Sequence, residues 1–182
     1  LRQLAETVHE EGGTVLLQLH HAGVVGFQEY LCPDSYRLND AVTGKKMTTE
    51  EIEAVTEAFI QAGRRAYEAG FDGVELHGCH SYLISQFLNS RVNRRDDIYG
   101  RKPEKRPVDI LTGIRRLVSP DFIVGIRLGV FEPALADGLR HARQMEEAGF
   151  DFLDISYGFT REQDLPALPE GFPFKDVIYA AG

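Results

Sequence analysis

The sequence contains only two cysteines, Cys32 and Cys79, among its 182 residues. Two thiols cannot form the disulfide framework that stabilises small secreted domains, so the composition is typical of a protein in the reducing cytosol. No apolar run is longer than a β-strand, and no membrane-spanning helix is therefore predicted. The N-terminus also has no signal-peptide pattern. We therefore expect a cytoplasmic protein without membrane contacts.

Positively charged residues are fewer than negatively charged ones: the sequence has 20 Lys and Arg residues and 28 Asp and Glu residues, for a net charge of -8. No basic block offsets this balance, which argues against nucleic-acid binding. The glycine-rich motif GxGxxG and the P-loop are absent after every predicted strand, so nucleotide binding of those kinds has no support. The first residue is Leu1, from which we expect a piece of a longer protein.

A repeated pentapeptide reveals how the chain is organised. Glu-Ala-Gly-Phe-Asp occurs at Glu68–Asp72 and again at Glu147–Asp151, and a weaker copy begins at Glu10. Each copy ends a helical pattern and precedes an apolar run, and glycine is the usual left-handed cap after a last helical turn. A fourth apolar run covers Phe122–Leu128. These junctions predict helices that alternate with parallel strands.

The connections between these elements favour a barrel. Thr48 and Glu51 have capping-box spacing. Apolar residues at helical spacing follow in three segments: Ile52 to Ala66, Pro107 to Leu117 and Leu135 to Met145. The strand-to-helix connections, roughly residues 21–47 and 78–103, are long, as they are where the loops of a (β/α)₈ barrel build an active site. A full barrel needs roughly 250 residues. We therefore predict an α/β fold, part of a TIM barrel with about four βα units, in which residues 1–182 form one partial domain.

Polar residues recur near the end of each predicted strand, on the face away from the helices. They are Gln18, Glu75 and His77, Arg127, and Asp154 and Ser156. Such groups are costly to bury without partners. They therefore predict a polar site at this rim of the barrel, although a self-satisfied hydrogen-bond network is the alternative.

The densest cluster of reactive residues is His77–Tyr82, directly after a strand. Imidazole N–H groups can stabilise an oxyanion, and a tyrosine can deliver a proton. A metal site that uses His77, His80 and Glu75, with Cys79 as a further possible ligand, is the competing interpretation, but the HxxH spacing is a weak signal. The other reactive residues are expected to be structural. We expect both cysteines to be small buried groups. The segments 94–97 and 101–106 are expected to be charged and exposed to solvent. His9, His20 and His141 are expected to be surface or packing residues.

Four segments of the sequence have a further feature in common: residues 18–23, 71–88, 93–100 and 124–128. In matching order over about residues 1 to 175, they resemble the Old Yellow Enzyme family of NAD(P)H:flavin oxidoreductases. Phe71–Ile84, continued by Gln86–Leu88, resembles the family's signature segment. Residues 93–100 resemble its N-x-R-x-D-x-Y-G motif through Asn93, Arg95, Asp97, Tyr99 and Gly100. Gln18–Gly23 resembles Q-L-x-H-x-G, and Val124–Leu128 resembles V-G-x-R-L.

The resemblance implies an FMN-dependent ene-reductase with NADH or NADPH as reductant. Gln18 would bind the pyrimidine edge of FMN, and Arg127 would lie beside N1 and O2, where positive charge favours the reduced flavin. His77 and His80 would hold the carbonyl oxygen of an α,β-unsaturated substrate, and Tyr82 would protonate its α-carbon. The four strands resemble the third to sixth of the family's barrel.

Three departures from the family pattern stand out. Val24 stands where many members of the family have an arginine, and Arg101 stands where the family has a glycine. Ser81 replaces the glycine that usually precedes the tyrosine, and this replacement could shift Tyr82. Two other functions stay open beside the ene-reductase: a metal-dependent barrel enzyme that uses His77, His80 and Glu75, and a non-catalytic half-barrel that only packs. The open edges of such a sheet would favour a homo-oligomer.

Overall fold

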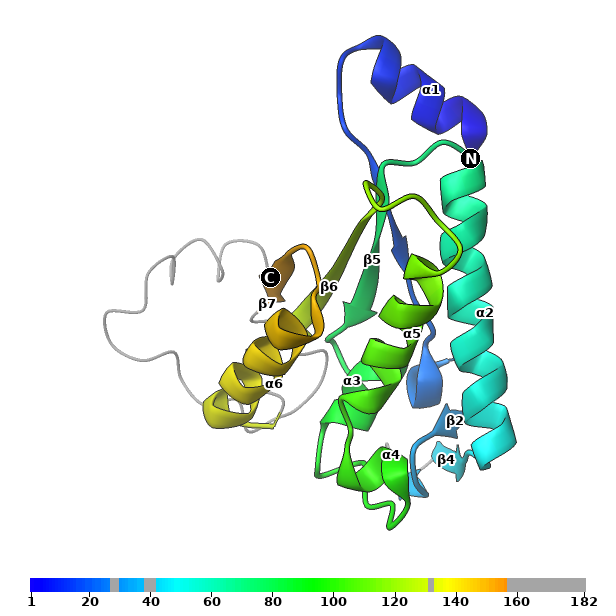
Figure 1. The fold of residues 1–182 in the computed structure, drawn as a ribbon. Helices are drawn as coiled ribbons and strands as arrows, with labels where there is room; N and C mark the ends of the chain where they lie inside the picture. The colour runs from blue at the N-terminus through cyan, green and yellow to red at the C-terminus, as the bar shows by residue number, and fades with distance from the viewer. Residues whose placement is uncertain (27–29, 38–41, 131–132, 157–182) are drawn as a thin grey trace.

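The computed structural model describes residues 1–26, 30–37, 42–130 and 133–156 (Figure 1). Its main strands are β1 (Leu16–Leu19), β5 (Gly73–Gly78), β6 (Ile123–Gly129) and β7 (Leu153–Ser156). Its longer helices are α1 (Arg2–Glu10), α2 (Thr49–Glu68), α5 (Lys105–Arg115) and α6 (Leu135–Ala148). Shorter elements lie in the connections: η1 (Gly23–Val25), β2 (Leu31–Cys32), β3 (Tyr36–Arg37), β4 (Thr43–Lys46), α3 (Leu83–Leu88) and α4 (Ile98–Arg101).

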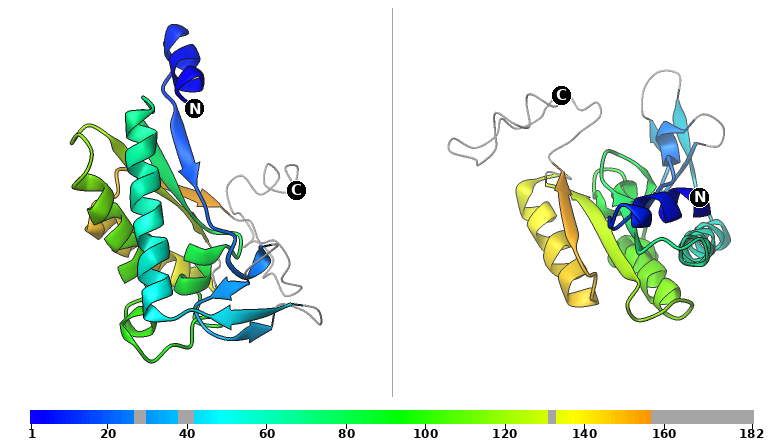
Figure 2. Two further views of the ribbon diagram at one scale, coloured as in Figure 1. Left: turned by 90° about the vertical axis from the view of Figure 1, so that its right-hand side faces the viewer. Right: turned by 90° about the horizontal axis from the view of Figure 1, so that it is seen from above.

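The four main strands form one parallel sheet in the order β1-β5-β6-β7, so each strand lies beside the next one along the chain. Helices α2, α5 and α6 connect these strands and lie on the same side of the sheet (Figures 1 and 2). Stepwise addition of strands with all helices on one side is the arrangement of a barrel wall. The four predicted strands and the three predicted helices are therefore confirmed.

The core lies between the sheet and these helices. Every second residue of β5 and β6 is fully buried there, namely Val74, Leu76, Val124 and Ile126. Phe59 of α2, Ile110 and Ile114 of α5 and Met145 of α6 pack in the same cluster. Because side chains alternate along a strand, the polar residues of β5 and β6 project from the opposite face.

Local signals fix the ends of the helices. Thr48 and Glu51 form the complete capping box predicted at the start of α2. Gly70 and Gly149, the glycines of the repeated pentapeptide, follow α2 and α6 with φ angles of 89° and 92°. A side chain strongly disfavours these left-handed angles, so glycine ends both helices.

The connection from β1 to α2 contains a small sheet that the sequence did not predict. Its order is β2-β4-β3, with β2 parallel and β3 antiparallel to β4. Its strands are two to four residues long, too short for a pattern of alternating hydrophobicity. Gly44 lies against Cys32 and Val24, which joins this sheet to the loop after β1.

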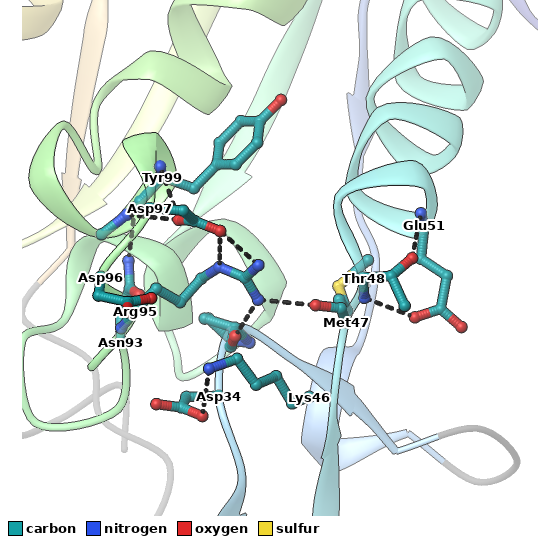
Figure 3. A network of polar contacts seen from close by, with 12 residues as sticks. Asp34, Lys46, Met47, Thr48, Glu51, Asn93, Arg95, Asp96, Asp97 and Tyr99 are labelled. Carbon is teal, nitrogen blue, oxygen red and sulfur yellow. Dashed lines mark hydrogen bonds and ion pairs between the residues drawn. The ribbon is translucent and has the colours of Figure 1, made fainter.

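The prediction that residues 94–97 are an exposed charged loop is wrong for Arg95, whose side chain is only 5% exposed. Its guanidinium binds the Asp97 carboxylate at 2.8 and 2.5 Å. It also donates to the backbone carbonyls of Pro33 and Met47, both at 2.7 Å (Figure 3). Arg95 therefore joins the connection between β5 and α5 to the small sheet. Its guanidinium is hydrogen-bonded to one carboxylate and to two backbone carbonyls.

Arg106 was predicted to be solvated, and this is also wrong because it is fully buried. The guanidinium lies 4.5 Å from the ring centroid of Phe87 and 6.0 Å from that of Phe59. Within the described residues its nitrogens have no hydrogen-bond partner, so cation–π contacts are its favourable interactions there.

Helix α6 is formed as predicted, but not all of its apolar residues are buried. Met145 is buried, whereas Leu135 and Leu139 are 40% and 52% exposed. The apolar spacing thus identified the helix but overstated its buried face. No helix among the described residues is long and apolar enough to span a membrane.

Candidate active site

The polar residues predicted at the strand ends do gather on one face of the sheet. Strand register places Gln18 beside Glu75, and His77 beside Arg127, which is in turn beside Asp154. Ser156 lies one step further, opposite Gly129. All of these are at the carboxyl ends of parallel strands, the end at which barrel enzymes carry their active sites.

His77 and His80 bring two ring nitrogens together just beyond β5. His77 Nε2 lies 3.2 Å from His80 Nδ1, and His80 Nε2 lies 2.7 Å from the Ser156 hydroxyl oxygen. The chain achieves this with two consecutive left-handed residues, His80 and Ser81, whose φ angles are 58° and 59°. Such angles are strained for residues other than glycine and are characteristic of functional sites. Ser81, which replaces the glycine of the family pattern, thus adopts a left-handed conformation that glycine tolerates better than serine.

Both imidazoles are held in the neutral form. Burial, reinforced by the nearby His80, His20 and Arg127, lowers the pKa of His77 to about 4. Burial and then the charge of Arg127 lower the pKa of His80 too, against an opposing effect of Asp154. At neutral pH each ring therefore carries one N–H and one lone pair, and the pair can present two N–H groups to a single acceptor.

Tyr82 lies against the same two-histidine cluster. Its ring centroid is 4.9 Å from that of His77 and 4.4 Å from that of His20, which it meets edge to face at 87°. The site therefore combines the predicted residues His77, His80 and Tyr82. His20, expected to be a surface or packing residue, is exposed and packs on the tyrosine ring.

Gln86 is a site residue that sequence reasoning did not assign. Its buried amide donates to the carbonyl of Ser81 at 2.6 Å and accepts from the backbone N–H of Val24 at 3.3 Å. A Cβ at Gly23, where φ is 62°, would collide with this amide. Gln86 thus joins the loops after β1 and β5 and supports the turn before Tyr82. The only signal in the sequence was its place in the Gln86–Leu88 motif.

The predicted cofactor residues lie on either side of the histidines. The Gln18 amide donates to the Glu75 carboxylate, which leaves the Gln18 carbonyl oxygen as an acceptor. Arg127 Nε lies 3.2 Å from Asp154 Oδ2 but has no hydrogen-bond partner among the described residues. An amide and a cation with unused hydrogen-bonding capacity, set at the carboxyl ends of neighbouring strands, fit the polar edge of a flavin ring.

The metal ligands proposed from the sequence are only partly brought together. In the described part of the chain, the donor atoms of His77, Cys79 and His80 lie within 4.8 Å of one another. Glu75 is not a member of this group, since its carboxylate pairs with Gln18. Cys79 and Cys32 are both buried thiols, as predicted.

The sequence of this chain is similar to those of several known proteins. Residues 1–158 match the NADH:flavin oxidoreductase / NADH oxidase family. The chain is 38% identical to an NADPH dehydrogenase of Geobacillus sp. (strain WCH70), over 99% of the chain and 54% of the relative. It is 36% identical to an NADH oxidase of Thermoanaerobacter brockii, over 95% of the chain and 29% of the relative. The chain thus spans about half, or less, of the length of these curated relatives.

Solved structures give the same result. A complex of 2-naphthoyl-CoA reductase superposes with a TM-score of 0.83 at 25% identity, over 100% of this chain and 32% of that one. Morphinone reductase superposes with a TM-score of 0.78 at 26% identity, over 96% of this chain and 55% of that one. These matches confirm the resemblance to the Old Yellow Enzyme family and the partial TIM barrel. The chain belongs to the NADH:flavin oxidoreductase / NADH oxidase family.

Proposed function

We propose that the protein containing this chain is an FMN-dependent ene-reductase that uses NADH or NADPH to reduce a C=C bond conjugated to a carbonyl group. The observation that carries this proposal is the pair of facing ring nitrogens, His77 Nε2 and His80 Nδ1, 3.2 Å apart. Their position next to Tyr82 supports acid catalysis on a carbonyl compound held at the same place.

Gln18 and Arg127 would hold the flavin ring, the first through its amide and the second through its charge. When bound, FMN would supply the hydride that originates from the nicotinamide. The guanidinium of Arg127 carries a positive charge, so it favours negative charge on whatever lies against it. Asp154 limits that effect by pairing with Arg127.

His77 and His80 bind the carbonyl oxygen of the substrate. With His77 protonated on Nε2 and His80 on Nδ1, both N–H groups donate to the oxygen and withdraw electron density from the conjugated alkene. His80 Nε2 is then a lone pair that accepts from the Ser156 hydroxyl, at 2.7 Å. A neutral ring suits this role because it has one N–H donor for the ligand and one acceptor nitrogen for a second partner.

Tyr82 delivers the proton to the α-carbon from its phenolic hydroxyl. His20 and His77 contact its ring on two sides and restrict its orientation. The Gln86 amide holds the Ser81 carbonyl immediately before it. A positioned acid of this kind contributes on the order of 10²- to 10⁴-fold to a rate.

The substrate class is a small conjugated carbonyl compound. Two of the structural neighbours are named for the reduction of naphthoyl-CoA and morphinone, which supports an acceptor of this kind without selecting one. The relatives include proteins named for NADH and for NADPH, so the proposal covers either nicotinamide.

The test is to purify the protein, supply FMN and follow the flavin absorbance under anaerobic conditions. We expect NADH or NADPH to bleach the flavin and 2-cyclohexenone to restore its colour. In Tyr82→Phe, bleaching should persist while recovery slows by about 10²-fold or more. A protein that takes up no FMN, or a Tyr82→Phe variant that recovers at the wild-type rate, would contradict the proposal.

A further inference from the structure

Cys79 lies between the two histidines in sequence, and its thiol faces them in space. Its Sγ atom is 4.0 Å from His77 Nε2, the same nitrogen that faces His80 Nδ1. The proposed reduction makes no use of this thiol. Two imidazoles and a thiol in one group are the donor set that zinc and other thiophilic metal ions prefer.

From this geometry we propose that His77, Cys79 and His80 form a three-ligand binding site for a thiophilic metal ion such as Zn²⁺. It is not a catalytic centre, and it goes beyond the proposed reductase activity. The ion would bind at the position where the two histidines otherwise hold the substrate carbonyl. Binding therefore blocks that position.

The spacing of the donor atoms is close to what a tetrahedral zinc ion requires. With Zn–N bonds of about 2.0–2.1 Å and a Zn–S bond of about 2.3 Å, two nitrogens lie about 3.3 Å apart and a nitrogen and a sulfur about 3.6 Å apart. The two ring nitrogens are 3.2 Å apart, and the nitrogen-to-sulfur distance is 4.0 Å. All three donor atoms lie within 4.8 Å of one another, so the Cys79 side chain must move toward the histidines to complete the set. The fourth coordination position stays open.

The surroundings also suit a bound cation. His80 can donate a hydrogen bond from Nε2 to the Ser156 hydroxyl, and in that tautomer Nδ1 carries the lone pair that would bind the metal. The nearby positive charge of Arg127 is offset by its ion pair with Asp154. Binding converts the Cys79 thiol to a thiolate and releases its proton to solvent, which lowers the charge of the filled site by one.

The sulfur ligand makes the test specific. The purified protein is loaded with Zn²⁺ in the presence of a phosphine reductant, and bound zinc is examined by X-ray absorption. We expect one zinc per chain, with one sulfur at about 2.3 Å and nitrogen ligands at about 2.0 Å. Absence of stoichiometric zinc, or zinc bound only by nitrogen and oxygen, would overturn the proposal.

The chain provides a matched control, because its one other cysteine, Cys32, is also buried. Cys79→Ser should remove the sulfur signal and weaken zinc binding by about tenfold or more, whereas Cys32→Ser should change neither. Circular dichroism checks that both variants are folded. Persistence of the sulfur signal in Cys79→Ser would show that zinc binds elsewhere.

One consequence rests on the proposed function as well. If the ion occupies the carbonyl position, zinc should raise the apparent KM for 2-cyclohexenone in the wild type with little change in kcat. Measured against its own zinc-free rate, Cys79→Ser should be about tenfold less sensitive. X-ray absorption does not depend on turnover, so a failed reductase proposal and a failed metal proposal give different results.

Discussion

Arg127 and Asp154 occupy the same register position on adjacent strands β6 and β7, and Arg127 Nε lies 3.2 Å from Asp154 Oδ2. The two side chains are 34% and 40% exposed, so water screens the pair without removing it. Asp154 therefore reduces the positive potential that Arg127 contributes to the polar face of the sheet.

Asp154→Asn should raise the two-electron reduction potential of bound FMN by about 20 mV. Removal of the carboxylate leaves the charge of Arg127 unopposed, and positive charge beside the flavin favours its reduced, anionic form. For a two-electron couple, about 30 mV corresponds to about 1.4 kcal/mol, and a screened surface pair contributes roughly 1 kcal/mol. Redox titration against a reference dye measures the shift.

Asp121→Asn is the matched control for that prediction. Asp121 is exposed and precedes β6, at the opposite end of the strand from Arg127. The six residue steps from Asp121 to Arg127 span about 20 Å, beyond the distance at which salt screens exposed charges. An equal shift in both variants, or a lower potential in Asp154→Asn, would contradict the assigned role of Asp154.

The barrel wall could be predicted from the sequence because its signals are local. Side chains alternate between the two faces of a strand, and this alternation along β5 and β6 places His77 and Arg127 on the same face of the sheet. The placement does not depend on distant parts of the chain. A positive φ at Gly70 and Gly149 likewise follows from the helix ends that precede them. These features depend on a few neighbouring residues, which is why the strands and helices could be predicted correctly.

The buried arginines could not be predicted in this way. Arg94 and Arg95 are adjacent and chemically identical, but only Arg95 meets the carbonyls of Pro33 and Met47. Those partners come from a small sheet whose short strands have no pattern of their own. The burial of a charge depends on distant segments, so composition alone gave the wrong answer for Arg95 and for Arg106.

Gln86→Met should destabilise the protein and slow proton delivery by Tyr82. The substitution keeps the size of the side chain but leaves the buried Ser81 carbonyl and the Val24 N–H without their partner. We expect the free energy of unfolding to fall by about 2 kcal/mol. Recovery of the flavin by 2-cyclohexenone should slow more than bleaching by the nicotinamide.

Gln61→Met provides the comparison for Gln86. Gln61 forms an exposed hydrogen bond with Glu57 on α2, so its replacement should change stability by less than about 0.5 kcal/mol. Urea unfolding and stopped-flow absorbance give the two readouts. Equal effects of the two substitutions would show that the Gln86 amide does not support the turn.

Arg95→Ala should be severely destabilising, whereas Arg94→Ala should not. Loss of Arg95 leaves the Asp97 carboxylate and two backbone carbonyls without their cation (Figure 3). Removal of one member of a fully buried ion pair costs about 3–5 kcal/mol, and because the Asp97 side chain is 32% exposed we expect about 3 kcal/mol here. Arg94 is exposed, and its removal should stay within about 0.5 kcal/mol. Urea unfolding followed by circular dichroism compares the two, and a similar midpoint for both would contradict the network.

His141 on α6 should make the fold sensitive to acid. Burial, with a smaller effect of Arg140, lowers the pKa of His141 to about 4, against an opposing effect of Asp137. In the unfolded chain the imidazole takes up a proton near pH 6.5, whereas in the folded chain it does so only near pH 4. The unfolded state therefore binds more protons in this window, and stability falls as the pH drops from about 6.5 to about 4.

His141→Gln should remove up to about 3 kcal/mol of that loss, because each pKa unit corresponds to about 1.4 kcal/mol. The pKa of His77 is also lowered to about 4, so the free energy of unfolding of the variant should still fall partly in acid. The measurement is the free energy of unfolding in urea at pH 7 and at pH 4.5.

Arg143→Gln is the matched control. Arg143 lies at an exposed position of the same helix, so the substitution removes a charge without removing a buried imidazole and should leave the pH dependence unchanged. If His141→Gln loses as much stability between the two pH values as the wild type, His141 is not the group that titrates.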